Sequence, residues 1–522
     1  MSSALTAIWN RVYALLGRVS MYRLVFLALG VLSVIALLLS VFGLVVPTPG
    51  ELLATALVLG AVSVGVDLVV QRMLRRPVRA ESSLITALIL LFVLRPTLDP
   101  IGLLGIAIAA AAASVSKYVL AWRGRHIFNP AAIGATVVTV IAVLLPLDAG
   151  IGTSAWWVGS PALFAPVLLL GIVVLWRMER LRVVGLFLLV AIVVAVTRVL
   201  IQYAQAGLEA DLGTVVVQTI TASPFVFLGA FMLSEPLTAP PRRWQQLIVA
   251  AVVGVLAGWP IVIGEMTLGQ ERALLVGNLV AFLFCLRAAV RLRLVARTSP
   301  APSVREVTFE ATRRLRFEAG QYVELDVPHR RADARGTRRE FSILSAPEDL
   351  PTLRIAYRDG AGPQSSFKRA LAAVEPGDTL AATGVWGDFV LPRDRAAPLL
   401  MVAAGIGVTP FVSHLRHLTA QGERRDIVLV YVAADATQLL FRTDLVAADV
   451  PVIVVTPDPP EALPASWSWA GGARLDADAL GRVVPDLARR HAYVSGPPTL
   501  IADLSPALAR ARSIVTDAFS GY

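Results

Sequence analysis

The sequence predicts a polytopic α-helical membrane domain fused to a soluble module that combines an antiparallel β-barrel with an α/β domain. Three observations predict this division. The chain has 522 residues, which is too long for one hydrophobic core. Hydrophobic residues make up 56% of it and its mean hydropathy is +0.70, both above the norm for soluble proteins. Nearly all long uncharged runs fall before Arg297, and the rest has the mixed composition of a soluble α/β protein.

The excess of basic residues has a membrane explanation. The formal net charge is +10, which in a soluble protein would suggest nucleic-acid binding. Much of the arginine excess lies in short loops beside apolar segments, where it sets membrane orientation, so we expect no nucleic-acid partner. The one cysteine, Cys285, lies in an apolar run. Disulfides within the chain, four-cysteine iron–sulfur clusters and cysteine zinc sites are therefore excluded.

Apolar runs long enough, or nearly long enough, to cross a bilayer recur through the first half of the chain. They lie around residues 22–46, 51–70, 82–95, 100–121, 130–147, 161–176, 183–202, 215–233, 245–263 and 273–293. Taken as ten spans, they divide the nearby arginines unequally between the two sides of the membrane. One side receives only Arg95, Arg198 and Arg272 near its surface, and the other receives Arg72, Arg75, Arg76, Arg79, Arg123, Arg125, Arg177, Arg180, Arg182, Arg242 and Arg243. By the positive-inside rule the arginine-rich side is cytoplasmic, so we expect a plasma (inner) membrane protein whose termini and soluble half are cytoplasmic.

Ten spans divide into two sets of five, and an odd number inverts the second set relative to the first. Residues 82–100 and 223–241 are both short apolar runs that end in a charged residue followed by proline. Arg95-Pro96 and Glu235-Pro236 occupy the same place in the two runs. Proline stops a helix and leaves carbonyl groups unpaired, which is tolerated at membrane depth only where backbone lines a cavity or the protein interior. The sequence thus predicts two inverted five-helix repeats with a ligand site at their interface.

Both halves offer polar side chains to this site. Asn129 precedes Pro130 at the start of the fifth span, and Asn278 lies early in the tenth. Asparagine before proline is also an ordinary helix-start signal, which needs no ligand. Glu235 in an apolar stretch is costly unless it has a partner. The candidate partners are Lys117, Arg125 and a bound ligand.

Two runs in this half carry a family resemblance. HIFNPAAIG (126–134) and MLSEPLTAPP (232–241) resemble the B subunit of sodium-pumping NADH:quinone oxidoreductase and the D subunit of the Rnf electron transport complex, over roughly residues 20–295. The resemblance implies a flavin-containing membrane subunit that carries electrons across or along the membrane, with FMN or riboflavin as its cofactor. The positions that match the family's motifs are Asn129, Pro130, Glu235, Pro236 and Thr238.

The attachment of that flavin departs from the family. Its members usually carry FMN covalently on a threonine, in a pattern close to Asp-x-x-Ser/Thr-Gly-Ala-Thr. The nearest run here is 148–154 (DAGIGTS), which has Ile151 in place of the hydroxyl residue, Thr153 in place of Ala and Ser154 in place of Thr. The sequence therefore favours a noncovalent flavin.

The soluble half begins with strands. A short proline-containing segment, 298–303 (TSPAPS), is predicted to link the membrane domain, residues 1–297, to the soluble module. Alternating apolar residues at 304–309 and 321–327 predict antiparallel strands. We therefore expect residues 304–395 to form a small barrel.

The barrel carries an Arg-x-aromatic-Ser motif that can hold a flavin in two ways. Phe341 can stack on the flat isoalloxazine, while Arg339 and the Ser342 hydroxyl can bond the phosphate. A Gly/Ser turn then leads into a helix, where backbone N–H groups favour an anion such as a pyrophosphate. A solvent-facing turn with a capping serine has the same pattern. The residues of this turn assigned to the cofactor are Gly362, Ser365 and Ser366.

Residues 396–522 are expected to form a nucleotide-binding α/β domain. A buried-strand pattern at 399–404 is followed by Gly405-Ile406-Gly407-Val408-Thr409-Pro410 and an amphipathic helix. The glycines permit a tight turn and close approach of a dinucleotide, with Thr409 capping the helix. A later strand, 492–495, leads into the sharp turn Gly496-Pro497-Pro498.

Asp435 bears on which dinucleotide binds. It follows the predicted strand 427–434, with no arginine cluster nearby, and its carboxylate would repel a 2′-phosphate. This favours NADH over NADPH, although Arg442 weighs against that preference.

The whole segment 304–522 resembles the ferredoxin–NADP reductase superfamily. The resemblance implies FAD held by Arg339, Phe341 and Ser342, and a terminal aromatic, Phe519 or Tyr522, near the flavin ring. It also implies a nicotinamide positioned by Gly405, Gly407, Thr409, Pro410, Gly496 and Pro497. The sequence has Ser495 where a cysteine often precedes the Gly-Pro pair, which puts the rate of hydride transfer in doubt.

Together these features predict a membrane-bound NAD(P)H-dependent flavoprotein. Electrons would pass from cytoplasmic NAD(P)H through FAD to a membrane flavin, and on to a quinone or an extracytoplasmic acceptor, with or without ion coupling. No catalytic acid, base, nucleophile or metal is required. A haem-based reductase is strongly disfavoured, because only His126 lies in the membrane half. A partner redox protein is expected because the chain has no iron–sulfur centre.

One alternative belongs to another class. Inverted repeats with broken helices are also typical of transporters. The chain could therefore be an ion or small-solute transporter that its reductase domain regulates or energises.

Overall fold

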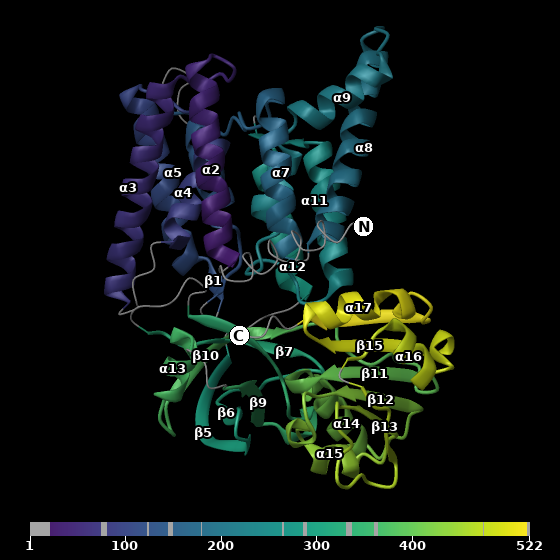
Figure 1. The fold of residues 1–522 in the computed structure, drawn as a ribbon. Coiled ribbons are helices and arrows are strands. Elements are labelled where there is room, and N and C mark those ends of the chain that lie inside the picture. The colour runs from purple at the N-terminus through teal and green to yellow at the C-terminus, as the bar shows by residue number, and fades with distance from the viewer. Residues whose placement is uncertain are drawn as a thin grey trace. The chain divides into compact units, whose positions relative to one another are not determined.

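The computed structural model describes residues 21–74, 81–122, 125–144, 150–178, 180–263, 266–284, 290–329, 337–359, 364–472 and 474–518 (Figure 1). The chain forms two compact units, Met1–Ala288 and Ala289–Tyr522. The described residues of the first form helices and two short hairpins, and the second contains both six-stranded sheets.

The helices of the first unit begin at ordinary helix-start residues. Thr48 and Glu51 form a capping box before α3, and Asp99 accepts a hydrogen bond from Gly102 N before α5. The helices are α2 (Met21–Val41), α3 (Pro49–Met73), α4 (Glu81–Val93), α5 (Pro100–Val119), α6 (Pro130–Leu144), α7 (Pro161–Arg177), α8 (Leu181–Gln205), α9 (Leu212–Ala222), α10 (Phe225–Leu228), the π-helix η2 (Gly229–Leu233), α11 (Arg243–Gly258) and α12 (Gln270–Phe284).

The prediction of about ten spans is wrong in number. Within the described residues, four helices are long and apolar enough to cross a membrane: α2, α3, α5 and α8. A fifth is added if α9 and the α10–η2 segment, bent by 42°, count as one span. The other apolar runs form shorter helices, such as α4 with 13 residues and α7 with 17. At 1.5 Å per residue these are roughly 20–26 Å long, less than a hydrocarbon core of about 30 Å.

The internal repeat appears in the order of the elements. The hairpin β1 (Ala121–Trp122) and β2 (Arg125–His126) precedes α6, and the hairpin β3 (Val262–Ile263) and β4 (Met266–Thr267) precedes α12. Helices α6 and α12 have 15 residues each and begin 140 residues apart. This spacing equals that between Arg95-Pro96 and Glu235-Pro236.

At the end of α4, the carbonyl groups of an interrupted helix are hydrogen-bonded inside an apolar unit. The backbone N–H groups of Ala155 and Trp156 both donate to the Val93 carbonyl at 2.9 Å, and Trp157 Nε1 donates to the Leu91 carbonyl at 2.7 Å. The loop between α6 and α7 thus hydrogen-bonds carbonyl groups that the helix break would leave unpaired.

The same loop is bonded to the start of α12. Glu271, which is fully buried, accepts hydrogen bonds from Ser154 Oγ at 2.6 Å and from Trp156 Nε1 at 2.7 Å. Arg272 Nη1 lies 3.1 Å from the same carboxylate. These bonds hold Trp156 at a φ of +47°, a conformation that costs an aromatic residue energy.

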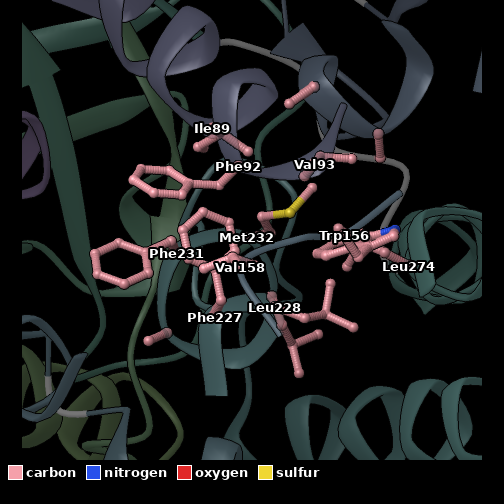
Figure 2. Packing of buried hydrophobic residues seen from close by; sticks show 14 of the residues in the cluster. Ile89, Phe92, Val93, Trp156, Val158, Phe227, Leu228, Phe231, Met232 and Leu274 are labelled. Carbon is pink, nitrogen blue, oxygen red and sulfur yellow. The ribbon is translucent and has the colours of Figure 1, made fainter. Parts of the chain in front are cut away.

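Aromatic side chains fill the space between the interrupted helices (Figure 2). The ring of Phe92 on α4 lies 5.3 Å from that of Trp157 and 5.4 Å from that of Phe227 on α10. Phe227 in turn lies 5.1 Å from Phe231 on η2. The two helix breaks therefore share one apolar core.

The barrel of the second unit starts earlier than predicted. Its strands are β5 (Val290–Ala301), β6 (Val304–Ala311), β7 (Tyr322–Asp326), β8 (Arg338–Ser342), β9 (Thr352–Arg358) and β10 (Thr379–Trp386), in the order β8-β7-β10-β5-β6-β9. An isolated bridge between Ile343 and Ile355 joins the two ends of this order. The short helices of this part are η3 (Pro347–Asp349) and α13 (Ser366–Ala372).

This corrects two sequence-based boundaries. The predicted linker at 298–303 is the end of β5 and its turn into β6, and the last predicted span, 273–293, runs past α12 into β5. From residue 290, the sequence VRLRL alternates buried and exposed residues, as in a half-buried strand. The side chain of Arg297 on β5 is tied to the barrel, because it donates to the Leu371 and Ala372 carbonyls at the end of α13.

The remaining residues form a parallel sheet covered by helices on both faces (Figure 1). The sheet order is β14-β13-β12-β11-β15-β16. The strands are β11 (Leu399–Ala404), β12 (Ile427–Val432), β13 (Val452–Val455), β14 (Trp467–Trp469), β15 (His491–Gly496) and β16 (Ser513–Ala518). The helices are η4 (Gly405–Val408), α14 (Thr409–Ala420), η5 (Ala436–Gln438), α15 (Arg442–Ala447), α16 (Ala477–Val483), η6 (Leu487–Arg489) and α17 (Pro498–Leu508).

We predict that Gly134→Ala destabilises the helical unit. A Cβ at Gly134 would lie 2.4 Å from the Ala109 carbonyl and 2.9 Å from Ala113 Cβ, so α5 and α6 would have to separate. We expect a loss of about 1–3 kcal/mol, as for other overpacked cores. Thermal unfolding in detergent, followed by far-ultraviolet circular dichroism, measures the effect.

The matched control is Gly60→Ala on α3, where a Cβ would meet nothing within 4 Å. That change should be neutral, or stabilising by about 0.5–1 kcal/mol because alanine favours the helix. Equal melting temperatures for the two variants would contradict the proposed close packing.

Candidate functional site

The carboxyl ends of β11 and β15 meet in a glycine-lined turn. Gly405 has a φ of +54°, which glycine adopts readily. A Cβ on Gly407 would lie 2.4 Å from the Ser495 carbonyl oxygen, so only glycine fits between η4 and β15. A Cβ on Gly496 would lie 3.0 Å from Ala404 Cβ. The structure therefore brings together Gly405, Gly407 and Gly496, as the sequence predicted.

The turn is held by bonds that the sequence pattern did not reveal. Tyr431 on β12 donates its hydroxyl to the Gly405 carbonyl at 3.1 Å and accepts from Leu440 N at 3.0 Å. Burial raises the pKa of Tyr431, so this hydroxyl stays protonated.

Thr409 does not cap α14 as predicted. It is the first residue of α14, and its hydroxyl donates to the Ile406 carbonyl at 3.0 Å. Pro410 follows in the first turn of the helix, where proline needs no donor.

Ser495 lies beside this glycine turn. It is fully buried at the end of β15, and its Oγ has no hydrogen-bond partner among the described residues. Pro497 follows at the start of α17. A buried hydroxyl without a partner is unfavourable unless a ligand supplies one, so its environment fits a polar group bound beside the glycine turn.

Asp435 lies at the next strand end, after β12. Its Oδ1 accepts from Thr437 N at 2.8 Å and its Oδ2 accepts from Gln438 Nε2 at 2.6 Å. Hydrogen bonds from Thr437, and then from Gln438, lower the pKa of Asp435, so its carboxylate is ionised at neutral pH.

Two arginines make contacts near this edge that the sequence did not predict. Arg442, which weighed against NADH, donates to the Ala462 carbonyl, and its guanidinium lies 5.5 Å from the Trp467 ring centroid. Arg358, on β9 of the barrel, was missed. Its Nη2 donates to Gln438 Oε1 at 3.0 Å and would lie 3.2 Å from a Cβ on Gly405. No local motif surrounds it, so only the fold could reveal its position.

The flavin motif lies on β8 of the barrel. Arg339 is buried, with its guanidinium 5.2 Å from the Phe367 ring centroid. Phe341 is half-buried and packs 5.8 Å from Phe367 and 6.1 Å from Tyr357. Ser342 is buried, and its Oγ has no hydrogen-bond partner among the described residues. The structure thus places an arginine, an aromatic ring and an unsatisfied hydroxyl on one short strand.

The turn after β9 is only partly described. Gly362 lies outside the described residues, as do Phe519 and Tyr522. Ser365 caps α13 by accepting from Lys368 N at 3.2 Å, which is the ordinary structural role considered for it. Ser366 Oγ lies 3.0 Å from Nε2 of His329, whose Nδ1 lies 2.8 Å from the Val327 carbonyl. His329 therefore joins the candidate site, although no sequence pattern marked it.

The two domains of this unit are joined through His414 on α14. Its Nε2 lies 3.0 Å from the Ala319 carbonyl and 2.9 Å from the Phe389 carbonyl, both in the barrel, so Nε2 carries the proton. The imidazole is fully buried and lies nearly parallel to the Phe389 ring, 5.9 Å away. Burial lowers the pKa of His414 to about 4. The neutral imidazole therefore fixes the barrel against the nucleotide-binding domain.

The predicted membrane site forms a cluster around Glu235. Its Oε2 accepts from Asn129 Nδ2 at 2.9 Å, and its Oε1 lies 3.0 Å from His126 Nε2. The Asn129 backbone N–H donates to Asn278 Oδ1 at 2.8 Å, across from α12. Thr238 lies at the edge of the cluster, with its Oγ1 3.4 Å from the Glu235 carbonyl. Residues from before α6, from α12 and from the segment after η2 therefore meet here.

The partners of Glu235 differ from those expected. Lys117 pairs instead with Asp67, at 3.0 Å, and both side chains are buried. The side chain of Arg125 lies outside the described part of the chain. The histidine was weighed only as a haem ligand, so the pairing of His126 with Glu235 was missed. Asn278 lies in the middle of α12 rather than near its start.

A cavity opens beside this cluster, between α2, α4, α6 and η2. Its enclosed volume is about 50 Å³. Its wall is mainly apolar, with polar groups from Asn129 and Glu235, and Pro130 and Pro236 complete it on that side. The apolar lining includes Val25, Ile85, Ile89 and Phe231. Such a wall suits a flat, mostly apolar ligand with a few polar atoms.

The hydroxyl nearest to the covalent flavin pattern is engaged in a protein contact. Ser154 Oγ donates to Glu271 Oε1, and Ser154 N donates to Thr139 Oγ1 at 3.2 Å. Asp148 lies outside the described residues.

Comparison with known proteins finds matches for parts of the second unit. Residues 401–505 match the family described as oxidoreductase NAD-binding domain. The chain is 36% identical over 158 residues to a ferredoxin–NADP reductase B of Sorangium cellulosum, covering 30% of this chain and 62% of the relative. It is 29% identical over 212 residues to the reductase subunit of an aromatic O-demethylase of an Amycolatopsis species, covering 38% of this chain and 59% of the relative.

The two sequence matches cover only part of each curated relative. The chain spans about 60% of the length of these two curated relatives. Among solved structures, a ferredoxin NADP+ reductase from Neisseria gonorrhoeae with bound FAD and NADP aligns at 17% identity and a TM-score of 0.37, covering 45% of this chain and 99% of that chain. The C-terminal region is an NAD-binding, ferredoxin-reductase-like module.

We predict that the second unit loses stability as the pH falls below about 6.5. The unfolded chain protonates His414 near its ordinary pKa of 6.5, whereas the folded chain resists protonation until about pH 4. The unfolded state therefore binds more protons in this window, and the loss reaches roughly 3 kcal/mol at its acid end. Urea unfolding of the full chain between pH 7.5 and 4.5, followed by tryptophan fluorescence, measures it.

His414→Gln keeps a donor for the two carbonyls but does not titrate. We expect this variant to be less stable at pH 7.5 and to show a flatter pH dependence. A variant with the same slope as the wild type would show that other groups cause the loss.

Proposed function

We propose that the chain is a membrane-bound NAD(P)H-dependent flavin oxidoreductase. In this proposal electrons pass from cytoplasmic NAD(P)H through FAD in the barrel to a flavin, FMN or riboflavin, in the helical unit. They continue to a quinone or an extracytoplasmic acceptor. One observation carries the proposal. The glycine turn and the strand with the flavin-type motif lie in one compact unit, and the same chain continues into an apolar helical unit.

The barrel residues fit FAD by their unsatisfied groups. FAD, when bound, supplies hydride acceptance from the nicotinamide and release of single electrons. Ser342 Oγ is a buried hydroxyl without a protein partner among the described residues, and Arg339 is a buried cation on the same strand. Arginine is well suited to a phosphate because its guanidinium donates several hydrogen bonds in one plane. Phe341 keeps part of its ring exposed for a planar group.

The edge of the parallel sheet fits NAD(P)H by its shape. Gly405 and Gly407 let a dinucleotide approach the backbone at the start of α14, as in other doubly wound domains. Ser495, buried and unsatisfied within the described part of the chain, would bond the nicotinamide end, where many relatives of this fold carry a cysteine. Arg358, held by Gln438, would bring a positive charge to the phosphates.

The second flavin is assigned to the cavity beside Glu235. The likeness of the runs at 126–134 and 232–241 to flavin-carrying membrane subunits supports this, together with the mainly apolar cavity. Asn129 and Glu235 would bond the polar edge of the ring system, and His126 would hold the carboxylate in place. Pro236 and Thr238 shape the backbone that carries Glu235. With Ser154 bonded to Glu271, a noncovalent flavin is the proposed form.

The proposed location is the plasma membrane, with the reductase unit in the cytoplasm. The distribution of arginines along the first half supports this orientation, since basic loops stay on the cytoplasmic side. The partners would be the lipid bilayer and a redox protein or quinone that accepts the electrons. No nucleic acid is involved.

A flavin count tests the proposal. Full-length protein purified in detergent should release two flavins per chain, FAD and one of FMN or riboflavin, and both should bleach with NADH. Arg339→Ala should lower the FAD content at least tenfold and leave the other flavin unchanged, because it removes the cation that binds the phosphate. Asn129→Ala should do the reverse. High-performance liquid chromatography of the released flavins gives the counts.

Arg395→Gln, at an exposed side chain, serves as the control and should keep both flavins. One flavin per chain together with solute flux in vesicles would favour the transporter alternative. A chain that binds no flavin would overturn the proposal.

We predict that Asp435→Asn weakens the preference for NADH over NADPH. The ionised carboxylate repels a 2′-phosphate and can accept a hydrogen bond from the ribose 2′-hydroxyl of NADH. We expect the ratio of kcat/KM for NADH to that for NADPH to fall about tenfold, equivalent to about 1.4 kcal/mol. Reduction of ferricyanide by the purified chain measures both values.

Arg442→Gln is the control, because Arg442 is bound to the Ala462 carbonyl and should leave the ratio unchanged. An unchanged ratio in Asp435→Asn would place the adenosine ribose elsewhere.

A further inference from the structure

The second unit carries an exposed basic surface at the end of the barrel where β5 begins. Four arginines form it: Arg291 near the start of β5, and Arg313, Arg314 and Arg316 in the segment that follows β6. All four side chains are at least partly exposed. We call these residues the basic patch.

The fold of the segment after β6 explains why the patch faces solvent. Thr312 N donates to the Arg291 carbonyl at 3.0 Å, which joins the segment to β5. Leu315 and Phe317 pack into the barrel core. Because these two side chains point inward, Arg314 and Arg316 are left on the outer surface.

Several other basic residues of this unit have carboxylate partners. Arg416 pairs with Asp444 at 2.7 Å, and Arg490 pairs with Asp426 at 2.8 Å. Next to the patch, Arg293 on β5 pairs with Glu310. Among the described residues, none of the four patch arginines forms an ion pair. Four unpaired positive charges on one surface favour an anionic partner.

The basic patch begins soon after the helical unit in the sequence. Only residues 285–289 separate the end of α12, Phe284, from the start of β5, Val290. Arg291 is therefore only seven residues from Phe284 along the chain.

We propose that the basic patch binds the anionic phospholipid headgroups of the bilayer that holds the helical unit. This inference rests on the membrane location in the proposed function and adds a second contact with the membrane. Guanidinium groups bind headgroup phosphates through charge-assisted hydrogen bonds. Each basic residue near an anionic membrane strengthens binding roughly fivefold, and salt screens this attraction. The contact would limit the orientations of the reductase unit above the membrane.

The test compares full-length protein in nanodiscs of phosphatidylcholine alone with nanodiscs in which about a third of the lipid is phosphatidylglycerol. Hydrogen–deuterium exchange of the peptide that covers residues 311–317 reports whether the patch is covered. At low salt we expect at least fivefold slower exchange in the anionic discs, and no difference at about 0.5 M salt, where the attraction is screened. The triple variant Arg313→Gln, Arg314→Gln, Arg316→Gln should lose this protection, because removing three charges weakens binding on the order of 100-fold.

Two further variants keep the test decisive. The triple lysine variant at the same positions retains the charge and should retain the protection. A control triple variant, Arg482→Gln, Arg489→Gln, Arg512→Gln, removes three arginines elsewhere in the unit and should behave as the wild type. Bleaching of flavin by NADH verifies that each variant is folded, and none of these residues touches the candidate nucleotide site.

Equal exchange in the two kinds of disc would overturn the inference, as would loss of protection in the control or lysine variant. Extraction of the chain from membranes by alkaline carbonate would instead show that the membrane location in the proposed function is wrong.

Discussion

The nucleotide-binding edge depends on the contact between Gly407 and the Ser495 carbonyl. The two strands β11 and β15 are neighbours in the parallel sheet, and their carboxyl ends can approach only because residue 407 has no side chain. This approach places the glycine turn beside Ser495, whose hydroxyl lacks a partner within the described residues. Tyr431 holds the other side of the turn through the Gly405 carbonyl. One close backbone contact thus places the glycine turn beside a buried hydroxyl that has no partner among the described residues.

The helical unit has two helix breaks, after α4 and after η2, where polar groups lie in apolar surroundings. Where α4 ends, carbonyl groups would face apolar surroundings, and the loop between α6 and α7 donates to them through Ala155, Trp156 and Trp157. At the corresponding break after η2, Glu235 instead meets His126 and Asn129 beside a cavity. The two breaks thus share a position in the repeat but differ in role. One is sealed by protein, and the other presents a carboxylate to a pocket.

Local patterns predicted the parts of the structure that depend on neighbouring residues. The glycine turn, the strand with Arg339 and the proline-ended helices all follow from short-range backbone rules. Pairings across the fold could not be predicted in this way. Arg358 approaches Asp435 through Gln438 from another domain, and His414 bonds two barrel carbonyls from a helix that otherwise resembles any amphipathic helix. The number of spans was overestimated because apolar runs indicate burial, whereas spanning also requires length. The start of β5 was missed because VRLRL comes after an apolar run without a break in hydrophobicity.

The position of β5 determines where the two units can be separated. This strand lies in the middle of the barrel, between β10 and β6, yet only residues 285–289 separate it from α12. A soluble fragment that started after residue 303 would lack a central strand and expose two unpaired strand edges to aggregation. The shortest autonomous form of the second unit must therefore include Val290. In the intact chain, any mechanical load on the helical unit is carried by a strand bonded on both sides, the arrangement in a sheet that best resists being pulled out.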